Sequence, residues 1–119
     1  MNYKLDKIVV LDCEVYPNYF LIAFKNRNNN KVSTIEIIGA DNCLSDLQIK
    51  KCLTILSKYT TVGFNSRNYD IPIILFALKR KTAKEIHQLS DFIINNSSLG
   101  WQTMQKFELY KPQQINHID

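Results

Sequence analysis

The order of apolar and polar residues along the chain predicts three strands at its beginning. Residues 7–15 carry apolar side chains on both alternating faces over most of their length, which is typical of a strand in the middle of a sheet. Residues 19–25 and 32–38 are rich in aromatic and β-branched side chains, and the polar run 26–30 separates them. We therefore expect a hairpin that continues antiparallel from the first strand.

Two capping boxes mark the beginnings of two amphipathic helices. Ser45 precedes Gln48 by three residues, and Thr82 precedes Glu85 by the same spacing, so in each pair a hydroxyl and a longer polar side chain can satisfy free N–H groups of the first turn. Apolar residues follow at helical spacing, namely Ile49, Cys52, Leu53 and Leu56 after the first box and Ile86, Leu89 and Ile93 after the second. The second helix is expected to end at residues 95–98.

Shorter elements lie between and after these helices. Residues 60–64 predict a short strand, and residues 71–78 are apolar on all sides, which predicts a buried helix with Pro72 in its first turn. Residues 114–119 resemble the start of a strand. This order predicts one α/β domain over residues 1–119, with a mixed sheet in which a three-stranded antiparallel meander is joined by crossover strands and flanked by helices.

Composition narrows the class of protein. Leu, Ile, Val and Phe supply 38 of 119 residues, enough for a core that needs no disulfide or metal. Three cysteines without CxxC spacing favour reduced thiols, and no apolar run is long enough to serve as a signal peptide or membrane span, so we expect a cytoplasmic protein without a membrane partner. A net charge of +4 is compatible with a polyanionic partner but does not demonstrate one.

The first chemical signal is a pair of carboxylates near the end of the first predicted strand. Asp12 and Glu14 are two residues apart, so both side chains project from the same face of a strand, roughly 7 Å apart at the backbone. Carboxylates at a buried strand end need compensation, which a divalent cation such as Mg²⁺ provides. The alternative is that the strand has already ended and both groups are solvated in a loop.

The second signal follows the strand predicted at residues 60–64. Asp70 lies at the start of the buried helix, and Asn65 lies in the connecting segment, so a carboxylate and an amide are placed near the end of a strand that neighbours the first. Asp70 can then face the same metal ions as the first pair. The alternatives are that Asp70 is an ordinary helix N-cap and that Asn65 is a turn residue with a positive φ.

These residues lie in two segments that resemble a known family. LDCEVYPNYFLIAF and VGFNSRNYDIPIILFAL, about fifty residues apart and in this order, resemble the first and second motifs of the DEDD (DnaQ-like) 3'-5' exonucleases, in the form found in the proofreading domain of phage-type DNA polymerases. The resemblance implies a ribonuclease H-like fold and a two-ion Mg²⁺ or Mn²⁺ site with Asp12, Glu14 and Asp70 as catalytic metal ligands. It also implies that Asn65 is the amide of the second motif. The expected substrate is the 3' end of single-stranded DNA.

The resemblance extends to the terminal HID but departs from the family beyond it. The third motif, a Tyr or His followed by a fourth carboxylate, is missing, because Tyr110 precedes Asp119 by nine residues and His117 precedes it by two. We therefore expect a domain truncated at its C-terminus, an incomplete metal site and weak activity of the isolated chain, with the remainder of a DNA polymerase as a partner. The alternative is a catalytically inactive binding module, and the exposed strand edge favours a homodimer.

Residues expected to contact nucleic acid are basic, aromatic or amide side chains near these motifs. Lys79, Arg80, Lys81 and Lys84 form a basic cluster at a helix junction that can meet phosphates. The alternative is that the cluster is only a solvated helix end. Tyr16 follows the first motif and can stack on a base, unless it packs in the hairpin. The assigned residues are Tyr16, Asn65, Arg67, Tyr69, Lys79 and Arg80. His87 and His117 have no spacing that suggests metal ligation.

Overall fold

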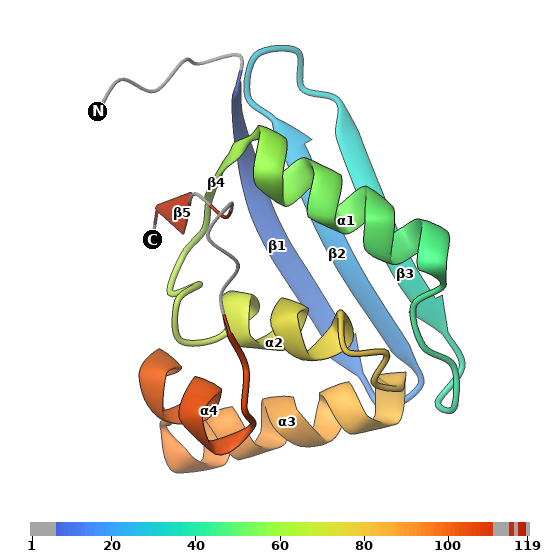
Figure 1. The fold of residues 1–119 in the computed structure, drawn as a ribbon, viewed down its shortest axis with the longest axis vertical. Helices are drawn as coiled ribbons and strands as arrows, with labels where there is room; N and C mark the ends of the chain where they lie inside the picture. Colours follow the sequence, from blue (N-terminus) through green and yellow to red (C-terminus); the bar gives the residue numbers. More distant parts are fainter. Residues whose placement is uncertain (1–6, 111–114, 116, 119) are drawn as a thin grey trace.

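The computed structural model describes residues 7–110, 115, 117 and 118. These residues form an α/β arrangement in which a five-stranded mixed sheet is flanked by helices (Figure 1). The elements are β1 (Ile8–Tyr16), β2 (Tyr19–Asn26), β3 (Val32–Ile38), α1 (Asp46–Lys58), β4 (Thr60–Val62), α2 (Asp70–Ala77), α3 (Ala83–Asn96), α4 (Gly100–Lys106) and β5 (His117–Ile118).

The strand order in the sheet is β3-β2-β1-β4-β5, as the predicted meander and crossover require. β1, β2 and β3 are antiparallel, whereas β4 pairs parallel with β1 and β5 pairs parallel with β4. β4 is short and pairs only with Ile8–Val10 of β1. On that side of β1, no strand in the described part of the chain pairs with the residues after Val10.

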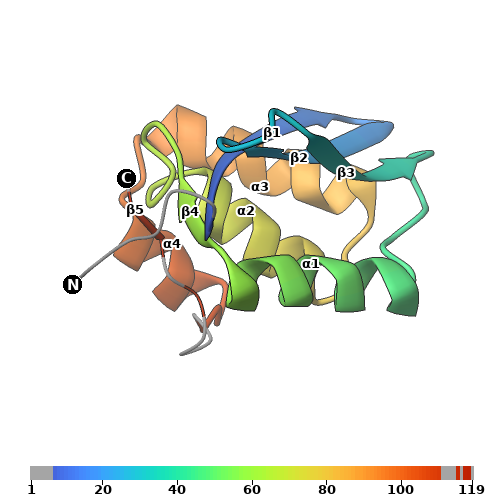
Figure 2. The ribbon, with the colours of Figure 1, turned by 90° about the horizontal axis from the view of Figure 1, so that it is seen from above.

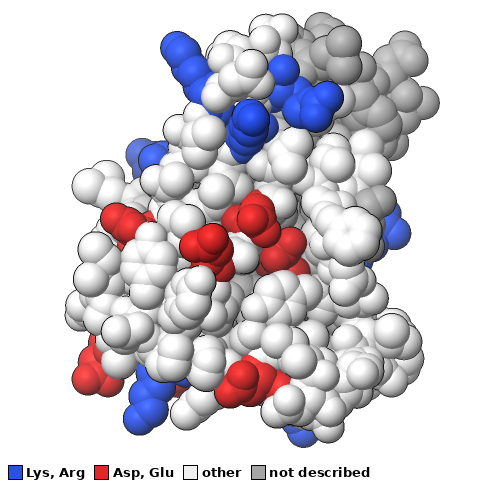
Figure 3. Space-filling model, turned by 180° about the vertical axis from the view of Figure 1, so that it is seen from behind, with Lys and Arg blue, Asp and Glu red and all other residues white. Residues whose placement is uncertain are grey.

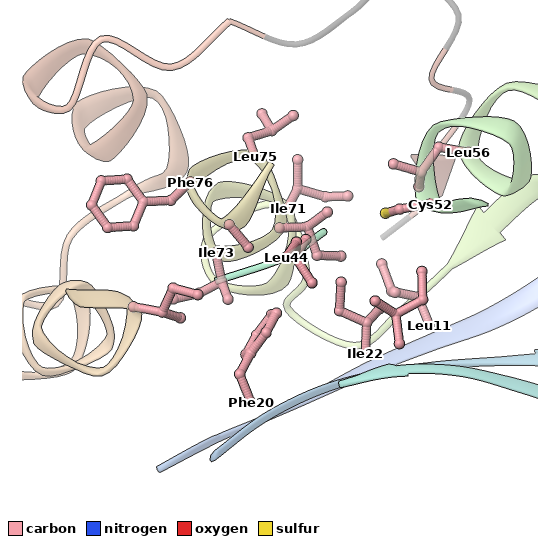
Figure 4. Packing of buried hydrophobic residues seen from close by; sticks show 14 of the residues in the cluster. Leu11, Phe20, Ile22, Leu44, Cys52, Leu56, Ile71, Ile73, Leu75 and Phe76 are labelled. Atoms are coloured by element: carbon pink, nitrogen blue, oxygen red, sulfur yellow. The ribbon is translucent and has the colours of Figure 1, made fainter. Parts of the chain in front are cut away.

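The hydrophobic core lies between the sheet and the helices. Figure 2 shows α1 and α2 on the same side of the strands, and the buried residues Val9 and Leu11 of β1 face them. In Figure 4 the side chains of Leu11, Phe20 and Ile22 rise from the strands toward Ile71 and Ile73 of α2 and toward Cys52 and Leu56 of α1. Every residue of α2 is buried, which confirms the helix predicted from its apolar surface.

Local signals placed most element boundaries correctly. Both capping boxes form, with Ser45 and Thr82 as N-caps whose hydroxyls accept from the N–H groups of Gln48 and Glu85. The predicted strand at residues 60–64 ends at Val62, because the chain turns away from β1 and leaves Phe64 96% exposed. Within the segment predicted at residues 114–119, His117 and Ile118 form β5, and positions 114, 116 and 119 lie outside the described residues.

One expectation about a helix was wrong, and one helix was missed. Leu53 was expected in the core stripe of α1, but it lies at the margin of that stripe and is 41% exposed, while Cys52 and Leu56 are buried. α4 was not predicted, because its seven residues carry no helical apolar repeat.

In the described part of the chain, no helix is long and apolar enough to cross a membrane.

Candidate active site on the open face of the sheet

The face of the sheet opposite α1 and α2 carries the first two predicted site residues. Strand alternation turns Asp12 and Glu14 away from the core, and both are exposed between the inward-facing residues of β1. Glu36 on β3 points to the same face, since Glu14 is opposite Leu21 and Leu21 is opposite Glu36. Figure 3 shows acidic side chains gathered in the middle of this face. The carboxylate pair therefore lies within a strand rather than in a solvated loop.

Asp70 lies beside the same stretch of β1, but on the core side of the sheet. Its side chain is 6% exposed and lies near the thiol of Cys13, the residue between Asp12 and Glu14. Burial raises the pKa of the Cys13 thiol well above its ordinary value, and the negative charges of Asp70 and Asp12 raise it further. One thiol thus lies within electrostatic reach of carboxylates from both predicted motifs.

The short length of β4 explains how Asp70 reaches β1. After Val62 the chain leaves the sheet, and the segment 63–69 leads to the start of α2. Gly63 lies close enough to β1 that a Cβ at this position would be 3.5 Å from the carbonyl oxygen of Leu11. Asp70 then begins α2 as its first helical residue, with Tyr69 as the N-cap. The alternative reading of Asp70 as an N-cap is therefore wrong.

A buried hydrogen-bond cluster holds the segment 63–69 to the last strand. His117 on β5 places Nδ1 2.6 Å from Oγ1 of Thr61 on β4, and its Nε2 is hydrogen-bonded to Oγ of Ser66. The carbonyl of Ser66 accepts from the N–H of Ile71 in the first turn of α2, at 2.8 Å. His117 was expected to have no metal role, and the structure gives it hydroxyl partners on both ring nitrogens. The cluster ties β4, β5 and the start of α2 together.

The beginning of α4 supports the same segment from its other side. The N–H of Gly100 donates to Oδ1 of Asn68 at 2.7 Å, and Nδ2 of Asn68 donates to Oδ1 of Asn65 at 3.3 Å. Asn65 has a φ of 51°, so the turn role considered for it is observed. Asn65, Asn68 and Leu99 lie along a cleft of about 480 Å³ between this segment and the end of α3.

The predicted nucleic-acid contacts do not all lie near the carboxylates. Tyr16 is 52% exposed at the end of β1, with its ring centroid 6.4 Å from that of Tyr19, whose hydroxyl donates to Glu36 at 2.6 Å. Arg67 is exposed on the segment before α2. Tyr69 is half-buried and hydrogen-bonded through its hydroxyl to Ser90 of α3 at 2.6 Å, which commits that group to the fold.

Lys79 and Arg80 lie at the opposite end of α2 from Asp70. Nine residues at the helical rise of about 1.5 Å separate Asp70 from Lys79 by roughly 13 Å along the axis. Arg80 forms an ion pair with Asp46 at the start of α1, at 2.5 Å, and Lys79 donates to the carbonyl of Glu108 at 3.5 Å. Lys79 and Arg80 are therefore engaged with the residues after α4 and with the start of α1, respectively.

The donor atoms on the open face fit a hard divalent cation. Asp12 and Glu14 offer exposed carboxylate oxygens from one face of one strand, the ligand type that Mg²⁺ and Mn²⁺ prefer. A carboxylate such as that of Asp70 can accept about four hydrogen bonds or ligand contacts when it is ionised. Within the residues described, no group of three or more His, Cys, Asp or Glu side chains is close enough to hold a metal ion. Asp12 and Glu14 are the two expected metal ligands that the structure brings together on one exposed face.

Comparisons with known proteins identify no relative for this chain. No family model matches it, and neither a curated protein nor a solved structure matches it. The site must therefore be interpreted from its own geometry and from the two motif-like segments.

Proposed function

We propose that this chain forms a ribonuclease H-like domain, or the N-terminal part of one, of a metal-dependent 3'-5' exonuclease that acts on DNA, of the type used for proofreading by phage DNA polymerases. The observation that carries the proposal is the placement of Asp12 and Glu14 on the open face, with Asp70 next to Cys13, the residue between them, on the core side of β1. The likeness of both segments to the first and second exonuclease motifs supports the same function.

Each residue has a distinct part in this proposal. Asp12 and Glu14 would hold Mg²⁺ or Mn²⁺ on a face that solvent and a nucleic-acid strand can reach, and Asp70, on the core side of β1, is the third carboxylate that the resemblance assigns. A bound divalent cation supplies charge stabilisation for cleavage of a phosphodiester bond. The segment from Gly63 to Tyr69 fixes the position of Asp70 between β5 and α4.

Calorimetric titration with Mn²⁺ and a nuclease assay on a 3'-labelled single-stranded oligonucleotide test this function. We expect Asp12→Asn to weaken Mn²⁺ binding by at least about tenfold and to abolish metal-dependent cleavage. Glu36→Gln is the matched control, because it removes one negative charge from the same face two strands away, and it should change Mn²⁺ affinity less than twofold. Equal effects of the two substitutions would show that only the general negative charge of the face attracts the ion.

A catalytically inactive nucleic-acid or protein binding module is the second candidate. It is favoured by the finding that the described residues contain no ready group of three metal-ligating side chains. Strand binding by the chain without any Mn²⁺-dependent cleavage, unchanged by Asp12→Asn, would identify this module and reject the exonuclease.

A further inference from the structure

The open face of the sheet continues beyond the carboxylates into a row of cationic side chains. Val10 is opposite Lys25 and Asp12 is opposite Ala23, so Lys25 is the diagonal neighbour of Asp12 on the same face. Such neighbours are about 7–8 Å apart between Cα atoms. The N–H of Arg27 donates to the carbonyl of Ile8 at 3.2 Å, which extends the ladder and puts the Arg27 side chain on this face, about 7 Å beyond Lys25.

These two cations are exposed and border a hollow. Lys25 and Arg27 line a cavity of about 430 Å³ together with Val10 and Asn30. Figure 3 shows Lys and Arg side chains gathered at the upper end of this face, above the acidic side chains in its middle. Among the residues that the structure describes, the ion pairs are Arg80 with Asp46 and His87 with Asp91, so neither Lys25 nor Arg27 has an acidic partner there.

We propose that Lys25 and Arg27 bind successive backbone phosphates of a single-stranded nucleic acid whose end lies at Asp12 and Glu14. This inference rests on the proposed function and adds the path of the strand to it. Carboxylates repel the phosphates of an approaching strand, and cations placed about 7 and 14 Å from Asp12 along one row offset that repulsion. A single row of cations matches a single backbone rather than a duplex. The steps of about 7 Å between Asp12, Lys25 and Arg27 are twice the rise per nucleotide of a strand in B-DNA, and this spacing suits an extended single strand.

The basic cluster between α2 and α3 is a poorer candidate for this strand. Lys79 and Lys84 flank the α2–α3 junction, at the end of α2 that points away from Asp70. Arg80 within this cluster is already paired with Asp46. A strand bound there would pass the helices and would not reach the open face, so this cluster provides a matched control with the same loss of charge.

The first experiment measures the salt dependence of binding. A 5'-fluorescein-labelled oligothymidylate of twelve nucleotides is titrated with the 119-residue chain in EDTA between 50 and 200 mM NaCl. Each phosphate contact with a single strand contributes about 0.7 to the slope of log K against log salt, so Lys25→Gln/Arg27→Gln should reduce the slope by about 1.4. The loss of affinity over this salt range should then be about sevenfold smaller than in the parent chain. Lys79→Gln/Lys84→Gln should leave the slope unchanged.

Three outcomes of this titration overturn the inference. These are no binding by the parent chain at 50 mM NaCl, an unchanged slope in Lys25→Gln/Arg27→Gln, and an equal loss of slope in Lys79→Gln/Lys84→Gln. Thermal unfolding of each variant accompanies the titration. All four side chains are exposed, so each melting temperature should stay close to that of the parent.

A second experiment locates the contacted phosphates and separates this inference from the proposed function. Neutral methylphosphonates at the second and third linkages from the 3' end should weaken binding to the parent chain but not to Lys25→Gln/Arg27→Gln, which is the coupling expected of direct contacts. Additive effects would refute the contacts. If the methylphosphonate effects are coupled to Lys25 and Arg27 but no Mn²⁺-dependent cleavage occurs, the exonuclease is rejected and the binding path is kept. If cleavage occurs and requires Asp12 but the effects are not coupled, only the binding path is rejected.

Discussion

Replacing Gly100 by alanine tests whether α4 supports the segment that carries Asp70. Gly100 is buried at the first position of α4, and a Cβ built on it would lie 2.2 Å from the carbonyl oxygen of Arg67 and 3.2 Å from Oδ1 of Asn68. The nearest atom belongs to the backbone, so it cannot rotate away as the end of a long side chain would. The substitution must push α4 and the segment before α2 apart.

Two opposed effects decide whether Gly100→Ala raises or lowers the free energy of unfolding. Alanine in place of glycine in a helix stabilises it by up to about 1 kcal/mol. Overpacking costs about 1–3 kcal/mol, and loss of the bond from the Gly100 N–H to Asn68 costs about 0.5–1.5 kcal/mol more. Gly100→Ala should therefore destabilise the chain by about 1–3 kcal/mol, which at roughly 4 °C per kcal/mol lowers the melting temperature by about 4–12 °C.

Urea and thermal unfolding followed by circular dichroism measure this change. Gln105→Ala is the matched control, since Gln105 is exposed on the same helix, and its free energy of unfolding should change by less than about 0.5 kcal/mol. If Gly100→Ala is as stable as the parent chain or more stable, α4 does not press on Arg67 and the support described for Asp70 is absent.

Other parts of the molecule lead to further predictions. Ile73→Ala, at a fully buried position of α2, should lower the free energy of unfolding by about 2–5 kcal/mol in urea denaturation, and a loss below 1 kcal/mol would contradict the packing. The pKa of Glu85 is lowered by the backbone N–H that it accepts in its capping box, so its contribution to stability is complete above the ordinary glutamate value and is lost as the pH falls through the lowered one. Glu85→Gln should flatten this part of the pH profile of the melting temperature, and an unchanged profile would refute the assignment. Of the three thiols, exposed Cys43 should react with a disulfide reagent at neutral pH, whereas Cys13 and Cys52, whose pKa values burial raises, to about 12 for Cys52, should react only after unfolding.

Much of the fold was predictable because its signals are local. The boxes at Ser45 and Thr82 place donors and acceptors within four residues of each other, and the apolar surface of α2 permits only a buried helix. α4 was missed because its seven residues carry no helical apolar repeat, and its position depends on the hydrogen bond from Gly100 to Asn68, two residues far apart in the chain. Leu53 was misplaced because the neighbouring elements decide how wide a stripe of the helix is buried. The spacing of apolar residues along the sequence does not contain that information.

The candidate site divides in the same way. Asp12 and Glu14 were predictable from alternation along one strand, whereas the contact of Asp70 with Cys13 depends on β4 ending at Val62. The alignment of Lys25 with these carboxylates requires the register between β1 and β2, which two sequence patterns on their own do not determine.

The strand order also bears on the sequence of events in folding. The meander from β1 to β3 closes through short turns, while pairing of Thr61 with His117 joins residues 56 positions apart. Local pairings form early because little chain entropy is lost in closing them, so the sheet should grow from the meander toward β5. In pulse-labelled hydrogen exchange during refolding, amide protons of β2 should be protected before that of Gly63, which donates to β5. The strand that holds Ser66 in place, and through it the start of α2, is then the last to dock, so a refolding chain completes the corner that carries Asp70 only at the end.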